Sequence, residues 1–290
     1  MKFGKIDNPG EIAFFLPPDH KDTNDILSNQ TAKVDRPNIN IGCAKWNKQY
    51  LKSFYPKGIG NKELEYYSSH FNCIEMNAFF YRIFPIEMVQ KWYDRSADDF
   101  LFHPKIPQTI SQFRRLKNCD DKVDQFLSSV HQFKEKLGTC FLQMHPTFGP
   151  DKLDDLESFI TKWPKDVALS VEVRHPEWYS NEKNSNALYQ LIESHNITHT
   201  ITDTSGRRDM LHMRLSTPKC FVRFTGSNHD SDYQRIDQWY ERLKLWIDLG
   251  IQEINFFIHQ NTDLGRPFLA DYFIQRLNKE LGYNLVRPID

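Results

Sequence analysis

Two glutamates and three basic residues have the types and spacing to carry out chemistry together. Glu75 and Glu172 each lie between apolar neighbours, where an unpaired buried carboxylate would be costly. Their available partners are Lys105, Arg174 and Arg223. Two carboxylates can act as acid and base when their surroundings separate their pKa values, and a facing pair also suits glycoside hydrolysis. Lysine and arginine suit binding of phosphate or carboxylate groups.

The stretch from Ala168 to Trp178 indicates how these residues are positioned. Leu169, Val171 and Val173 alternate with polar residues, which is the period-two pattern of a strand. The polar side becomes charged only at the carboxyl end, just before Pro176. A strand that is apolar early and charged late is typical of the working face of an α/β barrel.

The same alternation in the other strands adds polar residues at or just after their carboxyl ends. We expect these side chains to converge at one mouth of the barrel. Catalytic roles are predicted for Glu172, Glu75 and Lys105, and substrate-binding roles for Asn77, Tyr81, Gln143, Arg174, His175, Trp178, Asp203, Arg223 and Asn261. The alternatives are solvated loop residues, aromatic rings that only pack the barrel top, and an ion-pair network that only fixes its geometry.

Strand and helix signals alternate along most of the chain. Strands are predicted at 39–43, 73–77, 100–103, 139–144, 168–174, 198–202, 219–224 and 254–258, and helices at 61–71, 85–92, 121–137, 150–160, 186–195, 233–249 and 267–281. This series predicts an α/β fold, a (β/α)8 TIM-like barrel in one domain of residues 39–290. Residues 1–38 are predicted to be an N-terminal extension packed on the barrel. The rival is an open doubly wound sheet, but no Gly-x-Gly-x-x-Gly follows the first strand.

Composition and the absence of certain motifs argue against several classes of protein and several kinds of site. The formal net charge of −1 argues against a surface built for nucleic acid or anionic membrane. No apolar run reaches the roughly 18 residues of a membrane span, and the N-terminus lacks the pattern of a signal peptide. Five cysteines without a Cys-x-x-Cys pair predict free thiols and a cytoplasmic protein. Without a His-Glu-x-x-His motif, we predict neither a metal nor another cofactor, and the absence of a Gly-x-Ser-x-Gly motif argues against a nucleophilic serine of that kind.

Short motifs from Ile39 to Asn261 together resemble one family. They are Gly42-x-x-x-Trp46, Phe54-Tyr55-Pro56, Glu75-x-Asn77-x-x-Phe80-Tyr81, Phe100-x-Phe102-x-x-Lys105, Gln143-x-x-x-x-Phe148, Glu172-x-Arg174-His175-x-x-Trp178, Asp203 and Arg223-Phe-Thr-Gly226. Their order and spacing resemble the DUF72 (YecE-like) family of cytoplasmic proteins. The resemblance implies a TIM-like barrel with a pocket and implies no particular reaction. The family commonly has His where this chain has Thr225, and Asn-Asn where it has His259-Gln260-Asn261.

The leading hypothesis is that the protein binds an anionic small molecule, such as a phosphorylated or carboxylated sugar, and catalyses a reaction of it. Glu172 would act as acid or base, while Glu75 and Asn77 would orient the ligand and the cations would hold its charge. One alternative is nucleic-acid binding or phosphodiester cleavage on the same face, suggested by the aromatic residues and by the basic loop Gln112–Lys117. Another is a non-catalytic scaffold. No oligomeric state is predicted.

Overall fold

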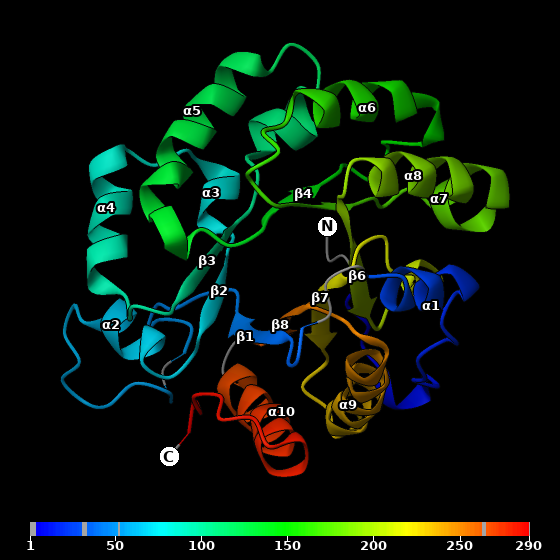
Figure 1. Cartoon of the computed structure of the whole chain (residues 1–290). Helices are drawn as coiled ribbons and strands as arrows, with labels where there is room; N and C mark the ends of the chain where they lie inside the picture. Colours follow the sequence, from blue (N-terminus) through cyan, green and yellow to red (C-terminus); the bar gives the residue numbers. More distant parts are fainter. Residues whose placement is uncertain (1–3, 31–33, 52, 263–264, 290) are drawn as a thin grey trace.

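Eight parallel strands surround a common axis and are enclosed by helices (Figure 1), in a computed structural model that describes residues 4–30, 34–51, 53–262 and 265–289. The strands are β1 (Asn38–Cys43), β2 (Cys73–Met76), β3 (Leu101–Pro104), β4 (Cys140–Gln143), β5 (Leu169–Glu172), β6 (Thr198–Thr204), β7 (Lys219–Gly226) and β8 (Glu253–Gln260). Their order is β3-β2-β1-β8-β7-β6-β5-β4. The predicted α/β barrel is confirmed.

The seam between β3 and β4 is narrow. It consists of isolated bridges, with Ile106 N donating to Phe141 O at 2.9 Å and Gly138 N donating to Phe102 O at 2.8 Å. A Cβ atom at position 138 would lie 2.5 Å from the His103 ring. Only glycine therefore fits at this seam, because any larger residue would push the two strands apart. The barrel is nearly closed.

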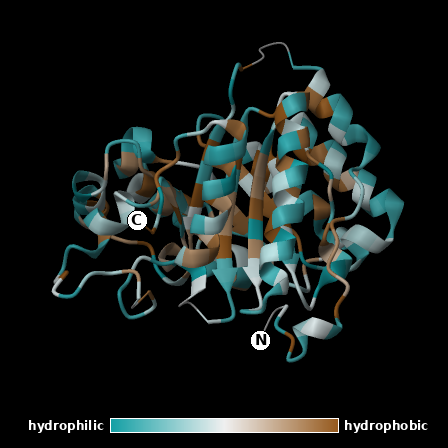
Figure 2. Cartoon of the chain, turned by 90° about the horizontal axis from the view of Figure 1, so that it is seen from below, coloured by the Kyte–Doolittle hydropathy of each residue, from teal (hydrophilic) through white to brown (hydrophobic). Residues whose placement is uncertain are grey.

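Amphipathic helices cover the outside of the barrel. They are α1 (Lys21–Ser28), α2 (Glu63–Ser68), α3 (Ala78–Tyr81), α4 (Ile86–Arg95), α5 (Asp120–Val130), α6 (Leu153–Lys162), α7 (Glu177–Ser180), α8 (Glu182–Ser194), α9 (Ser231–Leu249) and α10 (Arg266–Leu281). Short 3-10 segments at Pro9–Glu11, His131–Lys136, Pro150–Lys152 and Arg208–Met210, and a π-helix at Thr109–Phe113, complete the described helical segments. Figure 2 shows apolar strands enclosed by helices that turn hydrophilic surfaces outward.

One predicted helix is shorter than expected. The pattern predicted a continuous helix over 121–137, but α5 ends at Val130 and the chain continues as a 3-10 segment. Lys134 in that segment has a φ of 49°, which an α-helix does not allow. The apolar periodicity continues through both segments because each buries a side chain beside Phe79, namely Phe126 from α5 and Phe133 from the 3-10 segment.

Helix α1 occupies the place of a helix that is missing from the barrel series. Residues 205–218, all described, contain no α-helix between β6 and β7. Figure 1 shows α1 between α8 and α9, where that helix would lie. The hydroxyl of Thr23 donates to Met213 O at 3.0 Å and accepts from Leu215 N at 3.1 Å, and Leu27 is fully buried. Arg214 joins α1 to α8 through Asp22 at 2.8 Å and Glu193 at 3.1 Å.

The contacts of α1 bear on the predicted division into an extension of 1–38 and a barrel domain of 39–290. That division stays a prediction, and the contacts support packing of the extension on the barrel. They also indicate that the extension contributes to the helical ring, which the sequence pattern did not suggest.

The barrel interior is filled by an apolar layer. Cys73, Phe141, Phe221 and Phe257 form a separate buried cluster, with Leu101 packed against it. Four of these residues lie two positions before Glu75, Gln143, Arg223 and His259 on their own strands. Since side chains two apart on a strand share a face, this layer lies directly beneath those polar residues and forms a dry floor.

The role of α1 leads to a stability prediction. Replacing Thr23 by Val removes a buried hydroxyl that bonds to the β6–β7 connection at two points. We expect the Thr23→Val variant to lose about 1–3 kcal/mol of unfolding free energy, because buried backbone groups lose their partner. Urea unfolding measures this loss. The exposed neighbour Asn24, changed to Ala, is the control. Equal midpoints for the two variants would contradict a structural role for α1.

Candidate functional site

Arg223 of β7 links the two glutamates at the carboxyl end of the barrel. Its Nε and Nη2 atoms bind the two carboxylate oxygens of Glu75 at 2.9 Å each. Its Nη1 atom binds Glu172 Oε2 at 2.7 Å. All three side chains are buried. Because every nitrogen of this guanidinium contacts a carboxylate, Arg223 is the central cross-link between β2, β5 and β7.

Glu172 connects this pair to Lys105. Its Oε1 atom accepts from Arg174 Nε at 2.5 Å, and both its oxygens lie 3.2 Å from the Gln143 amide nitrogen. The Gln143 amide oxygen then accepts from Lys105 Nζ at 2.9 Å. The amide thus separates Lys105 from the nearest carboxylate. Gln112, in the π-helix after β3, donates to Gln143 O at 2.5 Å and holds β4 at this point.

Glu75 is held from a second side by two further residues. Asn77 donates to its Oε1 atom at 2.7 Å, and His259 Nε2 lies 3.0 Å from its Oε2 atom. We call the connected set the mouth cluster: Glu75, Asn77, Lys105, Gln143, Glu172, Arg174, Arg223 and His259. His259 was not among the predicted site residues, although its position in β8 has the same parity as the apolar floor residue Phe257.

Burial and charge act in opposite directions on the two carboxylates. Burial alone would raise the pKa of Glu172, but Arg174, Arg223 and Lys105 together hold it at about 2. Burial likewise would raise the pKa of Glu75, and the neighbouring Arg223 and His259 lower it well below its usual range. Both carboxylates are therefore ionised at neutral pH.

The pKa of Lys105 is shifted toward the neutral form, because burial outweighs the attraction of the carboxylates. Burial lowers its pKa, and the nearby charges of Arg223 and Arg174 lower it further, to about 7. The aromatic ring of Phe80 lies 4.1 Å from Nζ, and that of Phe141 lies 5.5 Å away. This lysine is thus poised to gain or lose a proton at neutral pH.

A small pocket of about 170 Å³ opens beside the mouth cluster. Its polar lining residues are Lys45, Asn47, Glu75 and Asn77, and Trp46, Tyr50 and Tyr81 supply aromatic walls. Tyr81 is 70% exposed, so its ring forms part of the rim. An aromatic wall next to a carboxylate suits a ring or sugar that carries hydrogen-bond donors.

Not every predicted site residue lies at the mouth. Asp203 was expected there, but its carboxylate faces α9, where it accepts from Trp239 Nε1 at 2.8 Å and Arg235 Nη2 at 2.7 Å. The expectation was wrong because Asp203 shares its face of β6 with Ile201, which packs in the outer core. The inward face carries Thr200 and Thr202 instead.

Trp178, His175 and Asn261 also make structural contacts. Trp178 is buried and donates through its indole nitrogen to Phe148 O at 2.8 Å. His175 is partly buried and its Nδ1 atom accepts from Glu177 N at 3.3 Å. The backbone nitrogen of Asn261 donates to Gly226 O at 3.1 Å, beyond the end of β8. Their predicted binding roles stay predictions.

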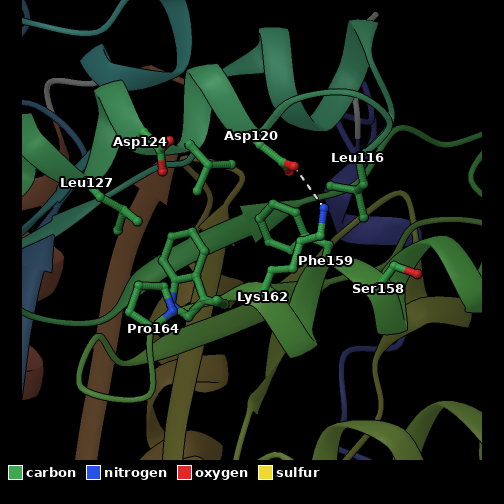
Figure 3. Close-up of a pocket in the computed structure, with 10 residues that line it drawn as sticks. Leu116, Asp120, Asp124, Leu127, Ser158, Phe159, Lys162 and Pro164 are labelled. Atoms are coloured by element: carbon green, nitrogen blue, oxygen red, sulfur yellow. Dashed lines mark hydrogen bonds and ion pairs between the residues drawn. The ribbon is translucent and has the colours of Figure 1, made fainter.

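Two further hollows among the described residues contain no member of the mouth cluster. A groove of about 270 Å³ lies on the outside, between α5 and α6 (Figure 3), with Asp120 and Lys162 paired across its rim at 2.8 Å. In the part of the chain that the structure describes, no group of three or more His, Cys, Asp or Glu side chains is arranged to hold a metal ion. No described helix is long and apolar enough to cross a membrane.

Comparisons with known proteins agree on one family. The family model described as "Protein of unknown function DUF72" matches residues 40–288. The UPF0759 protein YecE of Escherichia coli (strain K12) is 30% identical over 264 residues, which cover 84% of this chain and 94% of that protein. The UPF0759 protein YunF of Bacillus subtilis (strain 168) is 26% identical over 66% of this chain and 71% of its own length.

Solved structures of low sequence identity share the fold. A DUF72 family protein from Thermotoga maritima MSB8 has a TM-score of 0.68 at 18% identity, covering 83% of this chain and 99% of that one. A DUF72 family protein from Enterococcus faecalis V583 has a TM-score of 0.67 at 20% identity, covering 87% of this chain and 100% of that one.

The ion pairs of Glu172 predict an acid-sensitive fold. Its pKa is lower in the folded protein, at about 2, than the ordinary value of 4.5, so its contribution to stability is full above pH 4.5 and is lost as pH falls toward 2. We expect Glu172→Gln to lose about 3–5 kcal/mol at pH 7, because the buried Arg223 and the partly buried Arg174 each lose a charged partner. The variant should also depend less on pH in this window.

Urea unfolding of the parent and of Glu172→Gln at several pH values checks both effects. Glu177→Gln is the matched control, because Glu177 is exposed and lies five positions along the chain. A Glu172→Gln variant as stable as the parent at pH 7 would show that the mouth cluster does not depend on this charge.

Proposed function

The chain belongs to the DUF72 family, and we propose that it binds a small anionic molecule at the mouth of the barrel and acts on it. A phosphorylated or carboxylated sugar fits the chemistry of the site. The observation that carries this proposal is the position of Lys105, a buried cation whose hydrogen-bond partner is a neutral amide. A ligand anion would place a negative charge in direct contact with Lys105, whereas Glu75 and Glu172 act on it from a greater distance.

The charges of the mouth cluster support an anionic ligand. Glu75 and Glu172 contribute two negative charges, while Arg174, Arg223 and protonated Lys105 contribute three positive charges, which leaves an excess of one positive charge. The low-dielectric floor beneath the cluster strengthens the attraction for an anion. The binding of one anionic group would make the site neutral.

The contacts of each residue in the mouth cluster suggest a different role for it. Arg223 contacts both glutamates and maintains the cluster, so we assign it a positioning role rather than the anion-holding role first expected. A carboxylate with a pKa of about 2 is a weak base at neutral pH, so the acid–base role expected of Glu172 stays a prediction. Lys105 has the pKa better matched to proton transfer, at about 7. Glu75 and Asn77 line the adjacent pocket and would orient the rest of the ligand.

The two alternative functions have less support. In the loop Gln112–Lys117, Arg114 pairs with Asp121 at 2.5 Å and Lys117 with Asp155 at 3.1 Å, which reduces the positive charge offered to a nucleic acid. A gel-shift assay at low salt tests that function, and absence of a complex would exclude it. A scaffold without a ligand predicts that no compound in a panel of phosphorylated and carboxylated metabolites raises the melting temperature.

The pKa of Lys105 predicts how anion affinity depends on pH. An anion favours protonated Lys105, so the complex takes up a proton whenever the free protein has lost it. Affinity for sulfate, whose charge is constant near neutrality, should be roughly level below pH 7 and fall about tenfold per pH unit above it. Isothermal titration calorimetry in buffers of different ionisation enthalpy measures both affinity and proton uptake.

Two variants make this test specific. Lys105→Met should bind sulfate weakly and without the pH dependence. Lys117→Met removes an exposed lysine of the basic loop and should behave like the parent. Equal sulfate affinity in the parent and Lys105→Met, or an affinity in the parent that does not change with pH, would rule out Lys105 as the anion-binding group.

A further inference from the structure

Two buried lysines in this chain have very different surroundings. Lys136 is 4% exposed, and its Nζ atom donates to Tyr93 O at 2.8 Å, Ser96 O at 3.0 Å and Ser96 Oγ at 3.1 Å. Those three acceptors match the three hydrogens of an ammonium group. Lys105 is 6% exposed, and its Nζ atom donates to the Gln143 amide oxygen at 2.9 Å. The hydrogen-bonding capacity of the Lys136 amine is thus filled by three acceptors, whereas the Nζ atom of Lys105 donates to the Gln143 amide oxygen.

Burial and the neighbouring charges of Arg223 and Arg174 favour the neutral amine of Lys105, and they outweigh the opposing effect of Glu75 and Glu172. Among the described residues, no carboxylate oxygen lies within 4.0 Å of its Nζ atom. Both nearby glutamates are instead paired with arginines. The rings of Phe80 and Phe141, 4.1 Å and 5.5 Å from Nζ, attract an ammonium group through cation–π contacts, but they also exclude the water that would solvate it. A lysine desolvated by rings and placed near other cations is the known setting of an amine nucleophile.

We propose that Lys105 is a covalent nucleophile that forms an imine with a small anionic aldehyde or ketone. This inference rests on the proposed function, since the anionic group brings the carbonyl compound into the mouth. It narrows the ligand class to 2-oxo acids and phosphorylated aldehydes or ketones. The low pKa of Lys105 agrees with this role, because only the neutral amine attacks a carbonyl.

The step balances without an oxidant or reductant. The lone pair of Nζ attacks the carbonyl carbon, and the carbonyl π electrons move to oxygen, which receives a proton from the amine nitrogen. The carbinolamine then expels its hydroxyl group as water after protonation, and a carbon–nitrogen double bond forms. The products are one imine and one water. Protonated, the imine restores a positive charge 2.9 Å from the Gln143 oxygen, where the ammonium of Lys105 was held.

The fit of this chemistry to the fold comes from three features. The apolar floor of Phe141, Phe221 and Phe257 excludes water that would hydrolyse the imine. The protonated fraction of Lys105 gives the mouth cluster its one excess positive charge, which attracts the anionic group. The pocket lined by Glu75 and Asn77 adjoins the cluster and has room for the rest of a small molecule.

Reductive trapping tests the proposal directly. The full-length protein is incubated with pyruvate or with glyceraldehyde 3-phosphate in the presence of cyanoborohydride, which reduces an imine to a stable secondary amine. Intact-mass analysis counts the adducts, and peptide mapping locates them. We expect one adduct, on Lys105, to form at least about tenfold faster than any other, because exposed lysines remain protonated at neutral pH. The rate should rise between pH 6 and pH 8, as Lys105 loses its proton at a pKa of about 7.

Control variants separate the covalent role from a structural one. Lys105→Met should lose the fast adduct, while Lys136→Met should keep it. If Lys136→Met fails to fold, the exposed Lys117→Met variant takes its place. Adducts distributed evenly over the lysines, or an unchanged fast adduct in Lys105→Met, would overturn the proposal.

The same experiment distinguishes this inference from the proposed function. If sulfate affinity depends on Lys105 but neither carbonyl compound gives a Lys105 adduct, the imine is wrong and anion binding stands. If sulfate affinity does not depend on Lys105 and no adduct forms, both proposals fail.

Discussion

The mouth of this barrel depends on one electrostatic constraint. Two carboxylates, Glu75 and Glu172, are fully buried, and buried carboxylates remain ionised only when cations and hydrogen-bond donors compensate them. Arg223 meets most of that requirement because its planar guanidinium contacts both groups at once. Since the carboxylates are paired with arginines, Lys105 is left with a neutral amide as its partner. The reactivity proposed for Lys105 is a consequence of how the neighbouring charges are satisfied.

The same constraint explains the layers of the barrel interior. Charge pairs of this kind are strong only where water is excluded, and the floor of Phe141, Phe221 and Phe257 excludes it. The floor in turn requires the sheet to be nearly closed, and the seam between β3 and β4 permits this because Gly138 leaves room for the His103 ring. Gly138, which is distant from Lys105 in the sequence, therefore contributes to the water-excluded surroundings of the Lys105 Nζ atom.

The N-terminal segment adds a second structural dependence. The family match begins at residue 40, yet α1 lies before it and packs where the β6–β7 connection has no helix of its own. Buried contacts of Thr23 and Leu27 join α1 to the connection and to the core. In this chain, residues outside the matched region thus cover part of the barrel. The outer face of β6, including Asp203, is covered from the other side by α9.

Much of the architecture could be predicted from the sequence because strand periodicity is local. Alternation identified the strands and placed Glu75, Lys105, Gln143, Glu172 and Arg223 on equivalent faces, and their shared position at strand ends implied that they would meet. Periodicity separates the two faces of a strand but does not say which one points inward. For that reason Asp203 was assigned to the mouth, although its face of β6 turns toward α9.

Contacts between distant segments could not be predicted in the same way. Three-dimensional packing decides which cation pairs with which carboxylate. It also places the Gln143 amide between Lys105 and Glu172, and it places α1 between α8 and α9. The pKa of Lys105 follows from those contacts. The residue types and their periodicity are thus properties of the sequence, whereas the pairing of charges was decided by the closing of the sheet, because only the closed barrel brings β2, β3, β4, β5 and β7 around one buried point.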